Sequence, residues 1–165
     1  MAPFSIFIKD PTNITPETEE KSLLRIKGLC EKFIGTHNFH NYTKSMKATD
    51  PRANRYIMRM DCGLVDQQER GKYIKFVIQG QSFIYHQIRK MIGIMIQIVH
   101  QDLPDQFLSN SFYNNAVQIW LAPPHGLLLD RVTFDGYNKK KDIPEPLDFT
   151  EEEVLTQTSL YWVLE

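Results

Sequence analysis

Arg89 and Lys90 are the residues whose position most clearly suggests chemistry, because two cations follow the expected start of a helix. From Ile84 onward, apolar residues recur at the i, i+4, i+7 spacing of a helix with one buried stripe. This spacing predicts a helix over 84–99 with Ser82 as its N-cap. A cation near a helix N-terminus opposes the macrodipole by about 0.3–1 kcal/mol, so a nearby anion would compensate it. The alternative is an arginine whose stem lies at the edge of the core while its charge reaches water.

The segment 35–44 is rich in histidine, asparagine, threonine and aromatic residues, and a basic stretch follows it. A metal pair at His37 and His40 is one interpretation, but no third ligand of a suitable type lies nearby. In a purely structural alternative, the polar side chains hydrogen-bond to the backbone of turns and Phe39 packs inward. RNA contact fits better, because the loop could read shape while nearby cations engage phosphates. The expected RNA-binding residues are His37, His40, Asn41, Lys44, Arg52, Arg55 and Lys90.

The charge distribution supports a polyanion-binding face. The 165 residues carry a formal net charge of -1, yet residues 21–60 hold nine Lys and Arg against two acids. Residues 101–165 hold eleven acids against four bases. Such a separation suits a protein with a basic face that binds a polyanion and an acidic face on the opposite side. The alternative is that both sets of charges lie on ordinary solvated surfaces.

The composition, 42% hydrophobic and 24% charged, fits one domain with a real core. Cys30 and Cys62 lack the spacing of a zinc site or a disulfide framework, which fits a reducing intracellular compartment. No secretory signal is expected, and no membrane interaction, because the longest apolar run is too short to span a bilayer.

The order of predicted elements indicates an α+β fold. Alternation predicts strands at 4–8, 55–60, 72–78 and 127–134, and the first helix follows Thr15-Pro16. An irregular or short-helical segment is expected at 101–121. This order matches the ferredoxin-like unit, an antiparallel sheet with two helices on one face. The expected buried side of the first helix consists of Leu23, Leu24, Ile26, Leu29 and Phe33.

Several strings together resemble the eukaryotic TruA-type tRNA pseudouridine synthases. The central one, Gly-x-x-Phe-x-x-x-x-Ile/Val-Arg, spans Gly80 to Arg89. The others are Gly35–Thr43, Arg55-Tyr56-Ile57, Ala122–Leu129 and Glu145–Asp148. The resemblance implies that 1–148 is the C-terminal half of a catalytic domain, with a ferredoxin- or RRM-like fold, and that 149–165 is an extension forming a short helix or tail. It also implies that Arg89 pairs with a catalytic aspartate, that Leu128 packs near the target base, and that Phe83 packs in the pocket.

The family's catalytic aspartate lies in an Arg-Thr-Asp-x-Gly-Val-His string that this sequence does not contain. Asp50, in Thr49-Asp50-Pro51, lacks the flanking residues and is not expected to be catalytic. The resemblance therefore implies a parent enzyme that isomerises uridine in tRNA without a cofactor or metal, and a chain that is inactive alone.

The implied partners are tRNA or another structured RNA and the missing N-terminal half of the same domain. Self-association through the seam left by that half is also expected. The implied location is the nucleus or mitochondrion, or else the cytoplasm. The alternatives are an RRM-like RNA-binding module without catalysis, whose aromatic strand motif is missing here, and a regulatory remnant that has lost its catalytic half.

Overall fold

The computed structural model describes residues 16–67, 71–113, 115–127 and 162–164. The strands predicted at 4–8 and, beyond residue 127, at 127–134 lie outside the described residues, as does Leu128. Within the described part of the chain, no helix has the length and apolar character needed to cross a membrane.

The described residues form a sheet of four antiparallel strands in the order β1-β2-β3-β4. Strands β2 and β3 form a long hairpin in which Met60 lies opposite Ile78 and Gln67 lies opposite Gly71. The strands predicted at 55–60 and 72–78 are therefore confirmed, and both are longer than the sequence pattern indicated. The bounds are Gly35–Asn38 for β1, Asn54–Gln67 for β2, Gly71–Gly80 for β3 and Trp162–Leu164 for β4.

A register shift in β2 changes which side chains face the core. Ile57 and Met60 are both buried although they are three positions apart, and the pairing with β3 shifts between Ile57 and Arg59. An extra residue of this kind lets both side chains point inward, because strict alternation would place them on opposite faces. The outward face carries exposed apolar side chains, including Tyr56 and Val77.

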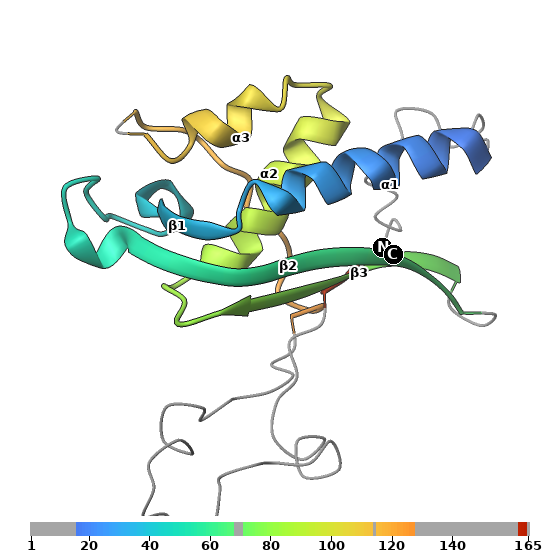
Figure 1. The fold of residues 1–165 in the computed structure, drawn as a ribbon, viewed down its shortest axis with the longest axis horizontal. Coiled ribbons are helices and arrows are strands. Elements are labelled where there is room, and N and C mark those ends of the chain that lie inside the picture. Colours follow the sequence, from blue (N-terminus) through green and yellow to red (C-terminus); the bar gives the residue numbers. More distant parts are fainter. Residues whose placement is uncertain (1–15, 68–70, 114, 128–161, 165) are drawn as a thin grey trace, which may run out of the picture.

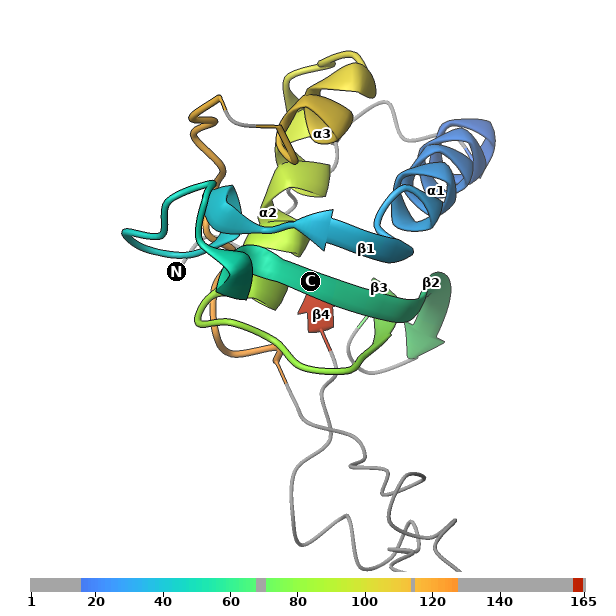
Figure 2. The ribbon, with the colours of Figure 1, turned by 60° about the vertical axis from the view of Figure 1, so that its left-hand side comes forward.

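In the described part of the chain, three helices lie on one side of the sheet (Figure 1): α1 spans Pro16–Glu31, α2 spans Gln87–His100 and α3 spans Gln106–Asn110. Single 3-10 turns occur at His40–Tyr42 and Pro51–Ala53. Figure 2 shows β1 beside β2 and, on the opposite side of β3, the short β4. The α+β class with an antiparallel sheet and helices on one face is confirmed, and α3 is the predicted helical part of 101–121.

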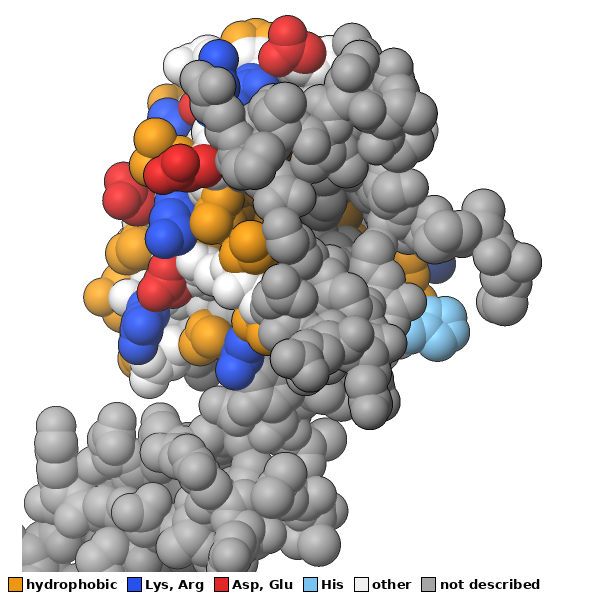
Figure 3. Space-filling model, turned by 90° about the vertical axis from the view of Figure 1, so that its right-hand side faces the viewer, with side chains coloured by type: hydrophobic (Ala, Val, Ile, Leu, Met, Phe, Trp, Pro, Cys, Tyr) orange, Lys and Arg blue, Asp and Glu red, His pale blue; other side chains and the backbone are white. Residues whose placement is uncertain are grey.

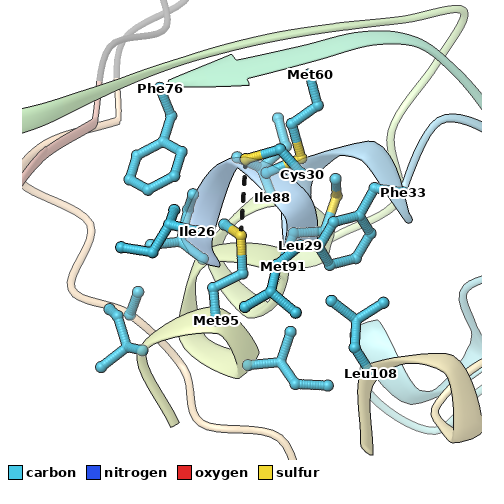
Figure 4. Close-up of a cluster of buried hydrophobic side chains, with 14 of the residues drawn as sticks. Ile26, Leu29, Cys30, Phe33, Met60, Phe76, Ile88, Met91, Met95 and Leu108 are labelled. Atoms are coloured by element: carbon cyan, nitrogen blue, oxygen red, sulfur yellow. Dashed lines mark hydrogen bonds between the residues drawn. The ribbon is translucent and has the colours of Figure 1, made fainter. Parts of the chain in front are cut away.

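The core fills the space between sheet and helices (Figure 4). Met60 and Phe76 point from the sheet toward the helices, and Cys30 on α1 donates to the Met95 sulfur on α2 at 3.9 Å. The prediction for α1 was right for Ile26, Leu29 and Phe33, which are fully buried, and wrong for Leu24, which is 71% exposed. A fully buried aliphatic or aromatic side chain contributes about 1.5–3 kcal/mol, so this cluster is the main source of stability.

Helix α2 differs from its prediction at its start and in its burial. It begins at Gln87 with His86 at the N-cap position, so the N-cap predicted at Ser82 is wrong. Residues 91–98 are all buried, where the sequence indicated a single apolar stripe. The reason is a second layer of chain: residues 111–113 and 115–122, which form no helix or strand in this described part, cover the side of α2 that would otherwise face solvent.

The extension predicted at 149–165 as a short helix or tail is described only at Trp162–Leu164. These three residues form β4 and pair with β3 through Phe76, Lys75 and Ile74. The domain boundary at residue 148 stays a prediction.

Candidate functional site

A tight turn precedes helix α2 and sets the conformation of His86. The Gln87 backbone N–H donates to the Ile84 carbonyl at 3.0 Å, and Gln87 Oε1 accepts from the Ile84 N–H at 2.9 Å. Gln87 is 1% exposed, so this turn is held from inside the protein. It places His86 at φ 69° and ψ -4°, a left-handed conformation that costs a residue with a side chain about 1–2 kcal/mol. The Gln87 side chain thus reaches back to an N–H ahead of the helix, as the third helical residue of a capping box does.

Arg89 lies in the first turn of α2 and is half-buried. Its Nε donates to the Ala122 carbonyl at 2.7 Å, and its Nη1 lies 3.3 Å from His86 Nδ1. Among residues 16–67, 71–113, 115–127 and 162–164, no carboxylate forms an ion pair with Arg89. Asp61 pairs with Arg59 at 3.3 Å. Arg89 therefore presents a partly buried, oriented positive charge.

Glycine at position 93 allows the 120–122 segment to reach Arg89. A Cβ atom at Gly93 would lie 1.9 Å from the Trp120 carbonyl oxygen, so no other residue fits without backbone movement. One turn further along α2, Gln97 Oε1 accepts from the Trp120 N–H at 3.3 Å. The Ala122 N–H then donates to the Arg89 carbonyl at 3.2 Å while the Ala122 carbonyl accepts from the Arg89 side chain. Ala122 thus holds both the backbone and the side chain of Arg89.

Lys90 and Asn41 connect α2 to the turn after β1. Lys90 Nζ donates to the carbonyls of Asn41 at 2.7 Å and Thr43 at 3.2 Å, and burial lowers the pKa of the Lys90 ammonium. The Asn41 amide donates to the carbonyls of Ser111 and Asn115 and accepts from the Val117 N–H. Both predicted RNA-binding side chains are therefore occupied by contacts within the protein.

An aromatic cluster surrounds the histidines of 35–42. Phe39 and Tyr42 are fully buried, and the His37 ring stacks on Phe112 with centroids 4.2 Å apart. His40 is 8% exposed and its Nδ1 lies 2.9 Å from Asn38 Oδ1; burial lowers the pKa of His40. Residues 35–38, predicted as loop, form β1 instead. Among the described residues, no group of three His, Cys, Asp or Glu side chains is arranged to hold a metal.

The basic stretch after this cluster lies at the surface. Lys44, Lys47 and Arg52 are exposed, and Arg55 is half-buried. Arg52 forms a two-point ion pair with Asp50, with an Nη2 to Oδ2 distance of 2.8 Å, and hydrogen bonds from Arg52 lower the pKa of Asp50. The structure brings Lys44 close enough to His86 to act on it electrostatically, together with Arg89 and Lys90.

Phe83 contacts the glycine that begins its motif. A Cβ atom at Gly80 would lie 2.7 Å from the Phe83 ring, so the glycine is needed for this ring to pack. Phe83 is half-buried against the core cluster. The Gly80 to Gly93 string therefore has a glycine at both points of close contact: Gly80 against the Phe83 ring and Gly93 against the Trp120 backbone. The predicted roles of Phe83 and Leu128 at a bound base stay predictions.

Comparison with known proteins identifies the family. A family model described as tRNA pseudouridine synthase matches residues 29–135, which include β1, β2, β3, α2 and α3. The chain belongs to the tRNA pseudouridine synthase family. The resemblance inferred from the strings is thus confirmed, and the match favours the synthase family over the RRM-like alternative.

Relatives with curated names agree with this synthase assignment. The chain is 38% identical over 136 residues to "Pseudouridylate synthase 1 homolog" of Mus musculus, which covers 81% of the chain and 32% of the relative. It is 36% identical over 148 residues to the protein of the same name from Homo sapiens, covering 88% and 35%. It is 38% identical over 112 residues to "tRNA pseudouridine(27/28) synthase" of Saccharomyces cerevisiae, covering 67% and 29%. The chain spans about a third of the length of these synthases.

The sequence analysis did not identify His86 and Gln87 of this synthase chain as residues of the site. Both lie inside the string that carried the family resemblance, but a glutamine that reaches back three residues leaves no periodic signal. The available signal was the two glycines: Gly93 lies inside a helical pattern, where a glycine indicates close packing, and Gly80 ends strand β3, where a glycine indicates close approach.

Proposed function

We propose that this chain supplies the arginine side of the active site, and part of the tRNA-binding surface, of a tRNA pseudouridine synthase. The proposed reaction is the isomerisation of uridine to pseudouridine in tRNA, without a cofactor or catalytic metal. The supporting observation is Arg89: it is half-buried, fixed by Ala122, and has no carboxylate partner among the described residues. Because the aspartate-containing string of the family does not occur in this sequence, we expect the chain alone to be inactive.

In the proposed mechanism, Arg89 pairs with the catalytic aspartate carried by the other half of the domain. A guanidinium binds a carboxylate through two parallel N–H donors, which fixes the plane of the acid as well as its charge. The pair keeps the aspartate ionised while the target uridine is turned out of the RNA stack into the cleft. Phe83 and Leu128 are proposed to pack around the base.

The proposed tRNA surface centres on exposed cations. Lys44 and Lys47 are exposed, and Arg52 adds a charge that Asp50 partly neutralises. Phosphate contacts of this kind supply affinity that falls steeply with salt. Asn41 and Lys90 belong to the proposal only as residues that hold the turn in place, because their side chains already bond to the protein. His37 stays a proposed contact at the edge of the surface.

Substitution of Arg89 tests the proposed role in catalysis. In the complete synthase, Arg89→Ala should abolish most turnover and leave tRNA affinity nearly unchanged, since the loss falls on the orientation and charge of the aspartate. Arg89→Lys should restore turnover only in part, because a point charge lacks the planar fork. Single-turnover kinetics and a filter-binding measurement of the tRNA Kd separate the two effects. Normal turnover of Arg89→Ala would contradict the assignment.

We also propose that the isolated chain self-associates. Tyr56, Met58 and Val77 are exposed on the sheet, and β1 forms one edge of it. Figure 3 shows hydrophobic side chains interspersed with charged ones at the end of the molecule that it faces, which favours weak association over aggregation. Light scattering should show a mass that rises with concentration; a strictly monomeric species at high concentration would contradict the proposal.

We further propose an intracellular location, in the nucleus or mitochondrion or else the cytoplasm. Cys30 and Cys62 are both free thiols, as expected in a reducing compartment. Imaging of the tagged full-length protein tests this, and secretion would contradict it.

A further inference from the structure

The contact between His86 and Arg89 defines the protonation state of the histidine. Arg89 Nη1 can only donate a hydrogen bond, so His86 Nδ1, 3.3 Å away, must accept it. The imidazole is therefore neutral and carries its proton on Nε2. The Arg89 guanidinium is held on two sides, by His86 at Nη1 and by Ala122 at Nε, and these contacts define its plane. Nη2 has no partner among the described residues.

His86 reaches this position only because its backbone is left-handed. The turn closed by Ile84 and Gln87 imposes φ 69°, and histidine is one of the few residues with a side chain that occurs repeatedly in this region. Residues kept in such conformations are held there by their surroundings and cluster at functional sites. Here a buried glutamine supplies that constraint, and the result is an acceptor placed one turn ahead of Arg89.

We propose that His86 is the positioning residue of Arg89: its Nδ1 accepts from the guanidinium and sets the direction in which the remaining donors face. This inference rests on the proposed function, in which those donors receive the aspartate of the other half. Without the His86 contact, Ala122 would hold the guanidinium at Nε only, and Nη1 would no longer restrain the side-chain torsions or the exchange of the two Nη groups about the partly double Cζ–Nε bond. Arg89 would keep its charge and its burial but lose the fixed plane that two-point pairing needs.

The surrounding charges favour the state that this role requires. Desolvation lowers the pKa of His86, and the cations Arg89 and Lys90 on α2 and Lys44 on the neighbouring loop lower it further. The Tyr85 ring, 3.7 Å from the imidazole between centroids, covers one side of it. Since the pKa lies below its ordinary value, the neutral form is present above about pH 6.5, and protonation at lower pH breaks the contact.

Two substitutions separate the acceptor from the backbone conformation. His86→Asn keeps an acceptor, because Asn Oδ1 is bonded to Cγ as Nδ1 is in histidine, and asparagine tolerates the left-handed region. His86→Gly relaxes the backbone strain and removes the acceptor. His100→Asn, at the exposed far end of α2, is the matched control.

In the complete synthase, we expect His86→Gly to lower kcat by roughly ten- to a hundredfold, with unchanged KM for tRNA, because misplacement of about 1 Å has effects of this size. His86→Asn should restore kcat and remove a limb of the pH–rate profile that lies below pH 6.5 in the unsubstituted enzyme. In the 165-residue chain, side-chain NMR should show slowed rotation of the Arg89 guanidinium in wild type, His86→Asn and His100→Asn, and averaging in His86→Gly.

The outcomes distinguish this inference from the proposed function. If Arg89→Ala turns over normally, the role of Arg89 is wrong and the inference falls with it. If Arg89→Ala is inactive but His86→Gly keeps wild-type kcat, only the role of His86 is overturned. Equal losses in His86→Asn and His86→Gly would also overturn it, because the acceptor would then be irrelevant.

Discussion

Residues 35–42 and 44–55 adjoin each other in the chain, and both were predicted to contact RNA, yet they have opposite surroundings. In the first, Phe39, Asn41 and Tyr42 are buried, and the Asn41 amide and the Tyr42 hydroxyl both bond to Ser111. In the second, Lys44 and Arg52 face solvent. Composition alone does not separate the two, because aromatic and amide side chains suit an RNA surface and a buried hydrogen-bonded turn equally well. The distinction depends on a segment about seventy positions away.

The largest expected difference between the two regions is in stability. Phe39→Ala should lower the free energy of unfolding by about 3–5 kcal/mol, because the fully buried ring leaves a cavity beside Phe33, Tyr42 and Phe112. Urea denaturation followed by circular dichroism measures this. The matched control is Tyr113→Ala, whose ring is 64% exposed and whose loss should be within about 0.5 kcal/mol. Equal values for the two variants would remove the distinction between interior and surface.

Asn41→Ala should have the next largest effect, at about 2 kcal/mol. Its amide holds the Ser111 and Asn115 carbonyls and the Val117 N–H, and some of these groups would stay buried without a partner. Asn41→Asp should be worse at neutral pH, since a carboxylate would face two carbonyls. Its folded-state pKa would be raised, so its deficit should shrink as pH falls. Thermal unfolding at pH 5 and pH 8 tests this, and a deficit that is equal at both would count against direct contact with the carbonyls.

The smallest effect on stability and the clearest effect on binding are expected in the basic stretch. Lys44→Ala should leave the free energy of unfolding within about 0.5 kcal/mol and reduce the salt slope of tRNA binding by about one. Asp50→Asn should increase affinity and slope, because it frees Arg52 from its ion pair. Salt titrations of tRNA binding to both variants measure this. An unchanged slope in the double variant Lys44→Ala/Arg52→Ala would exclude this surface.

The sequence was sufficient where a signal is local and periodic. The first helix and the two strands of the β2–β3 hairpin follow from apolar spacing and turn residues, and the family strings located Arg89. The segment 101–121 was predicted only as irregular or short-helical. The pattern failed where distant residues decide. At 57–59 a bulge reverses the alternation that β2 would otherwise show. Leu24 was instead misassigned from the spacing itself, because it lies two positions before Ile26 and therefore on the opposite face of a helix with 3.6 residues per turn.

The sequence pattern also predicted a wrong start for α2 and missed the contacts of Arg89, for a related reason. Ser82 has the residue type of an N-cap, but the Gln87 side chain closes the turn that precedes the helix. The contacts of Arg89 with Ala122, 33 positions away, carry no sequence period at all. Such contacts become visible only when the fold is known, whereas the glycines that permit them can be read directly.

The close approach of Trp120 to Gly93 has a consequence for the order of folding. The hairpin and α2 can form from residues near one another, but the bonds of Ala122 to Arg89 must wait until the connecting chain closes over the helix, which carries an entropic cost. The guanidinium should therefore be among the last groups to be fixed, after the core around Met91 and Met95 has consolidated. In pulsed hydrogen exchange during refolding, the Ala122 amide should gain protection later than the amides of β2 and β3. A newly made chain would then form its hydrophobic core before the Arg89 guanidinium reaches its final orientation.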